Sequence, residues 1–193
     1  MAIAPTRAQA LELFKMYNKT ESLYKHALAV EAVMRHFASK YNEDVDKWGI
    51  IGLVHDLDYE MYPDEHCTKT EEILRGADWP DDYIRAILSH GWEICTDVEP
   101  VELMEKVLYA CDELTGLITT AVLVRPDKSI HSLALKSVKK RWKDKRFAAK
   151  VDRNIITKGA AMLELSIEEL IQETIAGMKL VAEDLDLAGV DKV

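Results

Sequence analysis

The chain has 193 residues, of which 48% are apolar and 31% are charged, and its formal net charge is −9. This is the composition of a globular protein with enough chain for one well-packed domain. It excludes a membrane-spanning helix, because the longest apolar run, residues 117–124, is too short to cross a bilayer. The acidic balance argues against nucleic acid as a partner.

The N-terminal segment, residues 1–15, lacks the basic start and continuous apolar stretch of a signal peptide. Cys67, Cys95 and Cys111 are an odd number of cysteines without CxxC spacing, which argues against a disulfide framework and a zinc knuckle. We therefore expect a cytoplasmic protein in which the cysteines are small, partly apolar filler residues.

Helical periodicity begins near the N-terminus, and helices are expected over residues 6–18, 20–41 and 44–57. Thr6 is suited to cap the first of them. The second has an apolar stripe with steps of three and four residues, made by Leu23, Ala27, Val30, Met34 and Phe37. The third becomes almost wholly apolar toward its end, which predicts a place at the centre of the core.

Prolines mark the next helices. After a loop at residues 58–62, Pro63 fits the first turn of a helix that ends near Gly76. Pro80 fits the first turn of the next helix, which ends at His90 and Gly91. A long helix is expected from Pro100 to about Val124, closed by Pro126.

Two or three further helices are expected between residues 128 and 187, where Ser166 and Glu169 have the spacing of a capping box. The sequence therefore predicts an all-α fold. We expect one domain over residues 1–193, with a core at about 20–125 and a C-terminal helical extension at about 126–193.

The dipeptide His55-Asp56 lies in an otherwise apolar run, residues 52–57. Burying an ionised carboxylate without a partner is costly, so something must compensate Asp56. A metal cation would do so and would also accept the neutral imidazole of His55. Taken alone, the pair could equally be a structural His–Asp hydrogen bond.

Four more polar side chains occupy positions that otherwise predict core or helix ends. His26 lies on the stripe of the second helix, Asp112 lies in the long helix, and His66 and His90 lie at helix ends. Each alone could be a hydrogen-bonded core residue, a cap or an exposed side chain. One shared cation explains them together, which predicts a metal site of His26, His55, Asp56, His66, His90 and Asp112.

Imidazoles and carboxylates together suit iron, manganese or zinc better than calcium or magnesium, and magnesium is a further candidate. His36 and His131 are predicted to be surface residues, because His36 is rotated off the stripe that carries His26. The basic segment at residues 136–150 is either a solvated helix face or a local attraction for an anionic ligand.

The order His26, His55-Asp56, Asp112 resembles that of the HD-domain superfamily of metal-dependent phosphohydrolases. The likeness is closest to predicted HD-superfamily hydrolases with an HDxDYExxPDEH run, which here extends from His55 to His66. It continues through residues 89–91 and 112–117 and covers about residues 24–187.

The resemblance implies an HD-type helical bundle with additional C-terminal helices. It implies a first ion held by His26, His55, Asp56 and Asp112, and a second that Asp56 would share with His66 and His90. In one respect the chain departs from many dinuclear members, since His66 follows Asp56 by only ten residues.

The resemblance also implies hydrolysis of a phosphate ester, either a nucleotide or a related small anionic molecule, by metal-activated water. Besides Asp56, the catalytic candidates are Asp58 and Glu60 for proton transfer and Lys69 for contact with a phosphate. The alternative roles are loop and cap residues for the two carboxylates and a solvated surface for Lys69.

Two other functions remain open at this stage. One is a ligand-binding or regulatory HD module without turnover, and the other is a di-iron oxygenase on the same scaffold. A metal-resolved phosphatase screen and aerobic turnover with bound iron would separate them. The sequence is compatible with a monomer or a homodimer.

Overall fold

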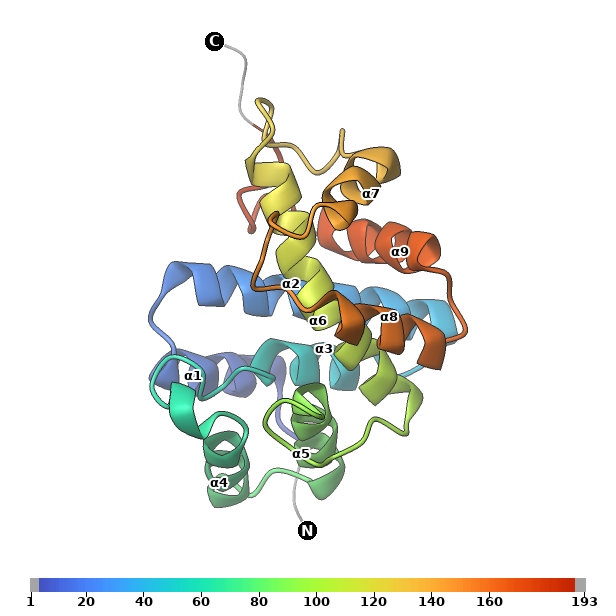
Figure 1. The fold of residues 1–193 in the computed structure, drawn as a ribbon. Coiled ribbons are helices and arrows are strands. Elements are labelled where there is room, and N and C mark those ends of the chain that lie inside the picture. The colour runs from blue at the N-terminus through green and yellow to red at the C-terminus, as the bar shows by residue number, and fades with distance from the viewer. Residues whose placement is uncertain (1–3, 190–193) are drawn as a thin grey trace.

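The computed structural model describes residues 4–189, and their regular elements are helices (Figure 1). In chain order these are α1 (Arg7–Tyr17), α2 (Glu21–Tyr41), α3 (Val45–Val54), η1 (Pro63–Glu65), α4 (Thr68–Gly76), α5 (Asp81–Leu88), η2 (Ser89–Gly91), α6 (Leu103–Leu123), α7 (Leu135–Lys143), α8 (Arg153–Met162) and α9 (Ile167–Lys179). Within residues 4–189 there is no strand beyond two isolated bridges, which confirms the all-α prediction.

Side-chain caps set several of the helix starts. The Thr6 hydroxyl accepts from the backbone N–H of Gln9, whose side chain accepts from the backbone of Thr6 in return. Ser166 and Glu169 form the same reciprocal pair at the start of α9, as the spacing predicted. These caps satisfy N–H groups that have no partner inside the helix.

The segment after α3 differs from the prediction. The α-helix ends at Val54 rather than at residue 57, and His55 and Asp56 lie in the turns that follow. Pro63 opens the 3₁₀ turn η1 as a first-turn residue, but the predicted helix from Pro63 is interrupted at residues 66 and 67 and becomes an α-helix only at Thr68. Cys67 has a φ of +69°, a left-handed conformation that interrupts the helix before α4 begins.

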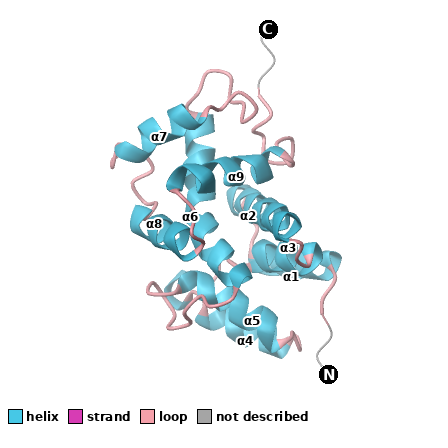
Figure 2. Ribbon diagram, turned by 90° about the vertical axis from the view of Figure 1, so that its right-hand side faces the viewer, coloured by secondary structure: helices cyan, strands magenta, loops and turns pink. Residues whose placement is uncertain are grey.

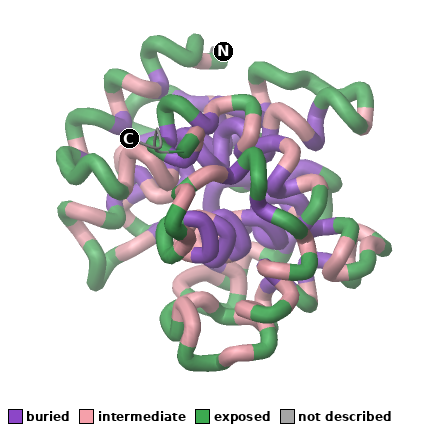
Figure 3. The backbone as a smooth tube through the Cα atoms, turned by 90° about the horizontal axis from the view of Figure 1, so that it is seen from above, coloured by how far each residue is buried: buried purple, intermediate pink, exposed green. Residues whose placement is uncertain are grey.

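α2 crosses the middle of the molecule and packs against α3, α6 and α9 (Figure 1). The turned view shows α1 beside α3, with α4 and α5 at the lower end (Figure 2). From above, buried backbone occupies the centre and exposed backbone the rim (Figure 3). The buried cluster extends from Ala10 to Leu187, so residues from both predicted parts of the chain contribute to it.

Glycines let the C-terminal helices approach closely. A Cβ on Gly177 of α9 would lie 2.8 Å from the Cα of Val33, and one on Gly159 of α8 would lie 2.5 Å from the Cα of Ala110. These contacts hold α9 on α2 and α8 on α6, the two helices that carry His26 and Asp112. None of the helices in residues 4–189 combines the length and hydrophobicity needed to span a membrane.

Candidate metal centre

Three helices bring the first group of polar side chains together. His26 comes from α2, His55 and Asp56 follow α3, and Asp112 comes from α6. The Nε2 atom of His26 lies 3.2 Å from Nε2 of His55 and 3.0 Å from Oδ1 of Asp112. His55 Nε2 lies 3.3 Å from the same oxygen of Asp112. Oδ2 of Asp56 lies 3.5 Å from both Nε2 atoms.

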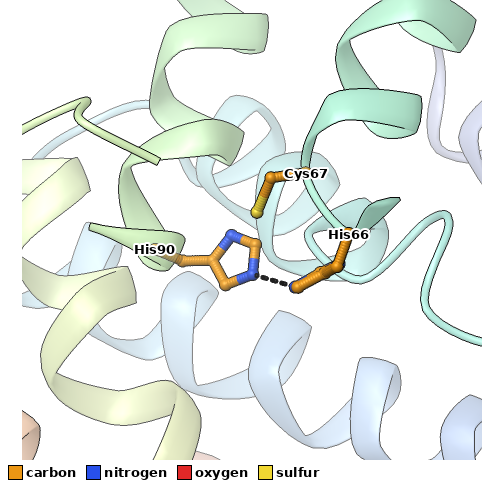
Figure 4. Close-up of side chains that lie close together, drawn as sticks. All are labelled: His66, Cys67 and His90. Atoms are coloured by element: carbon orange, nitrogen blue, oxygen red, sulfur yellow. Dashed lines mark hydrogen bonds between the residues drawn. The ribbon is translucent and has the colours of Figure 1, made fainter. Parts of the chain in front are cut away.

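The second group uses the other oxygen of Asp56. His66 precedes α4 and His90 lies in η2, and their Nε2 atoms are 3.2 Å apart. Oδ1 of Asp56 lies 3.5 Å from each of them. Figure 4 shows the His66 and His90 side chains directed at one another from separate elements. Asp56 therefore lies between two groups of ligand-type atoms, with one oxygen toward each.

Hydrogen bonds direct the Nε2 lone pairs of both groups inward. Nδ1–H of His55 donates to the carbonyl of Gly52 at 2.8 Å, and Nδ1–H of His90 donates to that of Ile87 at 2.5 Å. A carbonyl can only accept, so in the neutral imidazoles Nδ1 carries the proton and Nε2 carries the lone pair.

His26 and His66 are oriented by side chains. His66 Nδ1–H donates to the carboxylate of Asp58 at 2.6 Å. The Thr115 hydroxyl donates its proton to the Asp112 carbonyl at 2.8 Å, so at its 3.3 Å contact with His26 it can only accept from Nδ1. In their neutral forms all four imidazoles thus point an unprotonated Nε2 into the centre.

This arrangement fits metal ions. The imidazole lone pairs face one another and a carboxylate in a largely buried site. Such groups need a cation or protons between them, because they otherwise repel one another. Ligand atoms about 2.0–2.2 Å from an ion lie about 2.8–3.6 Å from one another in octahedral or tetrahedral geometry. The separations of 3.0–3.5 Å fall within that range.

The electrostatics agree with a site made for positive charge. Burial lowers the pKa of His55, but the carboxylates of Asp56 and Asp112 outweigh burial and raise it well above the usual value. Burial raises the pKa of each carboxyl, but the neighbouring histidines outweigh it and hold both far below the usual range. Both acids are therefore ionised when the site receives a cation.

A cavity of about 350 Å³ opens onto the two groups. Its wall includes four residues that the sequence reasoning did not select: Tyr59, Cys95, Glu113 and Lys150. Burial, followed by the charge of Asp112, raises the pKa of Glu113 to about 7. Tyr59 belongs to the HDxDYE run and Lys150 to the basic segment, so weak signals for both were present in the sequence.

Residues 23–117 match the family model described as the HD domain. The chain belongs to the HD-domain superfamily. All six predicted ligands lie within the matched segment, and HD domains bind divalent metal ions. Comparisons with curated proteins and with solved structures each gave no match.

Of the other candidate residues of this HD domain, Asp58 supports the centre without reaching its cavity. Its carboxylate is fully buried and accepts from Nδ1–H of His66 at 2.6 Å and from the backbone N–H of Thr70 at 2.8 Å. Both oxygens are engaged and neither lines the cavity. The geometry places Asp58 behind His66, where it fixes the orientation of the imidazole, and its part in proton transfer stays a prediction.

Glu60 and Lys69 are not brought to the centre. The Glu60 carboxylate accepts from the backbone N–H groups of Lys19 and Thr20 at 2.7 and 2.9 Å, which makes it a cap for the start of α2. The Lys69 ammonium pairs with Glu72 at 2.7 Å, its neighbour on α4. Neither lines the cavity, so the alternative cap and surface roles describe them better.

Cysteines adjoin the second group. Cys67 offers a sulfur within 4.8 Å of ligand atoms of His66 and His90 (Figure 4). Its Sγ lies 2.7 Å from Sγ of Cys95, and this contact and burial raise the pKa of the Cys67 thiol. The Cys67 sulfur therefore lies beside the second group while in contact with another sulfur. All three cysteines are free, and Cys67 and Cys111 are buried as predicted.

The two histidines predicted to lie at the surface differ. His131 is exposed, but the prediction for His36 is wrong, because its ring is half-buried and its Nε2 lies 2.7 Å from Glu173 of α9. The C-terminal helices cover this face of α2, which the sequence pattern of α2 alone could not reveal. Within the basic segment, Lys150 lines the metal cavity, whereas Lys139 pairs with Glu168.

Proposed function

We propose that this protein is a metal-dependent phosphohydrolase that cleaves a phosphate ester of a small molecule. The observation that carries the proposal is the pair of ligand groups that share Asp56, with four inward Nε2 atoms. We infer one ion held by His26, His55, Asp56 and Asp112 and a second held by Asp56, His66 and His90. Iron, manganese and zinc suit these donors best.

When bound, paired divalent ions acidify water and polarise a phosphoryl oxygen. The chain supplies the rest of the environment. Lys150 places a positive charge at the cavity wall, where it can pair with a phosphate oxygen. Glu113 lines the same cavity, where its carboxyl group can exchange a proton with a bound ligand. Tyr59, 47% exposed beside His66, can cover the bound ester.

The substrate that fits these charges is a small anion. We propose a cytoplasmic location, because free thiols such as these persist there. The structure contains a single chain, and the proposal holds for a monomer or a homodimer.

The test is a metal-resolved screen of the purified protein. Elemental analysis should find one or two divalent ions per chain, and phosphate release should require them. The Asp56→Ala variant should lose bound metal and activity together while its helical circular dichroism stays intact. The control is Asp64→Ala, an exposed carboxylate in η1, which should change neither.

Three outcomes would redirect the proposal. Activity that persists in metal-free Asp56→Ala would remove Asp56 from the centre. Stoichiometric metal without turnover on any phosphate ester would indicate a binding or regulatory module. Oxygen consumption with bound iron would indicate an oxygenase.

A further inference from the structure

Two cysteines lie in contact beside the metal centre, and we call them the sulfur pair. Cys67 follows His66 directly, and Cys95 lies in the turn after η2, so the two come from separate segments of the chain. Their Sγ atoms are 2.7 Å apart. The sulfurs of a disulfide are about 2.05 Å apart, so a bond between these two requires them to approach by less than about 1 Å.

Backbone hydrogen bonds hold the turn that carries Cys95. The carbonyl of Gly91 accepts from three consecutive backbone N–H groups, those of residues 94–96, at 2.9–3.1 Å. The Thr96 hydroxyl donates to the carbonyl of Leu88 at 3.0 Å. Cys95 is therefore fastened to η2, the element that carries a predicted metal ligand.

Gly91 provides the space in which the two sulfurs meet. A Cβ at this position would overlap Sγ of Cys95 and lie 2.7 Å from Sγ of Cys67. Gly159 and Gly177 differ, because a Cβ on either would lie closest to the Cα atom of a facing helix. A larger residue at position 91 would force the sulfurs apart.

A small reagent can reach the sulfur pair from one side. Cys95 is half-buried and lines the metal cavity, whereas Cys67 is fully buried. An oxidant in the cavity therefore meets the sulfur of Cys95 first. The φ of +69° at Cys67 is uncommon for a residue with a Cβ, and such backbone conformations cluster at functional sites.

We propose that Cys67 and Cys95 form a reversible disulfide when hydrogen peroxide enters the metal cavity, and that this bond tethers the segments that carry His66 and His90. The proposal goes beyond the proposed function, because the bond forms whether or not the centre cleaves a phosphate ester. Disulfides of cytoplasmic proteins are usually transient and act in catalysis or redox sensing.

The reaction balances with hydrogen peroxide as the oxidant. The sulfur of Cys95 attacks one peroxide oxygen, the O–O bond breaks, and the released hydroxide takes the thiol proton as water, which leaves a sulfenic acid. The sulfur of Cys67 then attacks the Cys95 sulfur, the S–O bond breaks, and hydroxide leaves with the Cys67 proton as a second water. Two molecules of an added thiol reverse the reaction by exchange.

The tether should hold the second group of ligands without rearranging it. The Cys67 sulfur lies within 4.8 Å of ligand atoms of His66 and His90 (Figure 4). Since the two sulfurs are already in contact, closing the bond leaves the two imidazoles facing one another. A cross-link also limits how far the two segments separate in the unfolded chain, which stabilises the fold.

The experiment treats the purified protein with hydrogen peroxide and then with dithiothreitol. Free thiols should fall from three to one and return to three, and peptide mapping should find Cys67 joined to Cys95. The Tm in chelator should be higher by about 5 °C or more in the oxidised form. Cys95→Ser should show neither change. The matched control is Cys111→Ser, a buried cysteine beside Thr174, which should still lose two thiols.

A second pair of variants tests the geometry of the sulfur pair. Gly91→Ala places a methyl group against both sulfurs and should slow disulfide formation at least about tenfold. Gly76→Ala, at the end of α4 where a Cβ would meet no atom within 4 Å, should not slow it. Oxidation of Cys95 to a sulfinic acid while Cys67 stays free, or a disulfide that leaves the Tm unchanged, would overturn the proposal.

Titration with chelator separates this proposal from the proposed function. The oxidised protein should keep its second ion to a higher chelator concentration than the reduced protein, because the tether holds the ligand segments together. Equal retention, or release of an ion on oxidation, would overturn the tether. A reversible disulfide and a raised Tm in a protein without metal or turnover would support the sulfur pair and count against hydrolysis. Metal-dependent turnover with thiols that form no disulfide would do the reverse.

Discussion

The most direct test of how the centre is held is Asp58→Asn. Asp58 is fully buried and accepts two N–H groups, from His66 and from the backbone of Thr70. Asparagine preserves the shape but offers one oxygen and one NH₂ group. Whichever way it turns, one of the two donors faces another donor. The ring of His66 then loses its fixed tautomer, or Thr70 loses a buried hydrogen bond.

The expected effect falls on the ion that His66 and His90 would hold. Removing an outer partner of a metal-binding histidine costs about 10–100-fold in metal affinity, or about 1.4–2.8 kcal/mol. The group of His26, His55 and Asp112 does not contact Asp58, so its affinity should stay unchanged. Asp58→Asn should therefore weaken one ion of two.

The assay is elemental analysis after equilibration against increasing chelator. Wild type should retain its second equivalent to a chelator concentration about 10–100-fold higher than the variant does. Asp64→Asn, an exposed change in η1, serves as the control. If both ions remain with wild-type affinity while turnover falls, the reasoning is refuted and Asp58 acts directly in proton transfer.

Four further predictions concern other parts of the molecule. Nearby carboxylates overcome burial to raise the pKa of His55 in the metal-free fold, so its stabilisation is fully present below pH 6.5 and is lost as pH rises through the raised pKa. The Tm measured in chelator should thus fall from pH 6 to pH 9, and a rising Tm would contradict this assignment. Glu60→Ala should lower the Tm, because the start of α2 loses its cap, and should leave the metal content unchanged. Loss of metal in this variant would show that Glu60 contributes to the metal centre. Cys67→Ser should keep all bound metal, whereas the loss of one equivalent would make its sulfur a ligand. Gly159→Ala should lower the unfolding free energy in urea by about 1–3 kcal/mol, because its Cβ would overlap the α6 backbone at Ala110, and an unchanged midpoint would show that α8 is free to move.

The helices could be predicted because local chemistry determines them. The apolar stripe of α2 and the capping pairs at Thr6 and Ser166 are short-range patterns, and the structure contains them. The helix predicted from Pro63 is interrupted at residues 66 and 67 for a tertiary reason. Cys67 has a positive φ, its sulfur contacts Cys95, and the side chain of His66 next to it faces His90. The neighbouring residues contain no pattern that predicts this backbone conformation.

The six predicted ligands could be selected because each is a polar residue where the pattern predicts burial or a helix end. The roles of the residues around these ligands could not be predicted from the sequence. Asp58 and Glu60 are both acidic residues in the same turn, yet one orients His66 and the other caps α2. Their side chains point in different directions along an irregular backbone, so their composition and spacing do not separate the two roles.

Two of the four imidazoles, however, are oriented by a hydrogen bond to a nearby residue in the sequence. His55 follows α3 and His90 follows α5, and each donates Nδ1–H to the carbonyl three residues before it. The last carbonyls of a helix have no N–H partner within that helix. A histidine just after a helix can therefore satisfy one such carbonyl and thereby present its Nε2 lone pair outward from the helix end. His26 lies inside α2 and His66 precedes α4, so neither follows a helix end that offers such a carbonyl. His26 is oriented by Thr115, from a distant part of the chain, and His66 is oriented by Asp58, from the adjoining turn. The position of a histidine relative to a helix end thus indicates whether its orienting partner can be found from sequence.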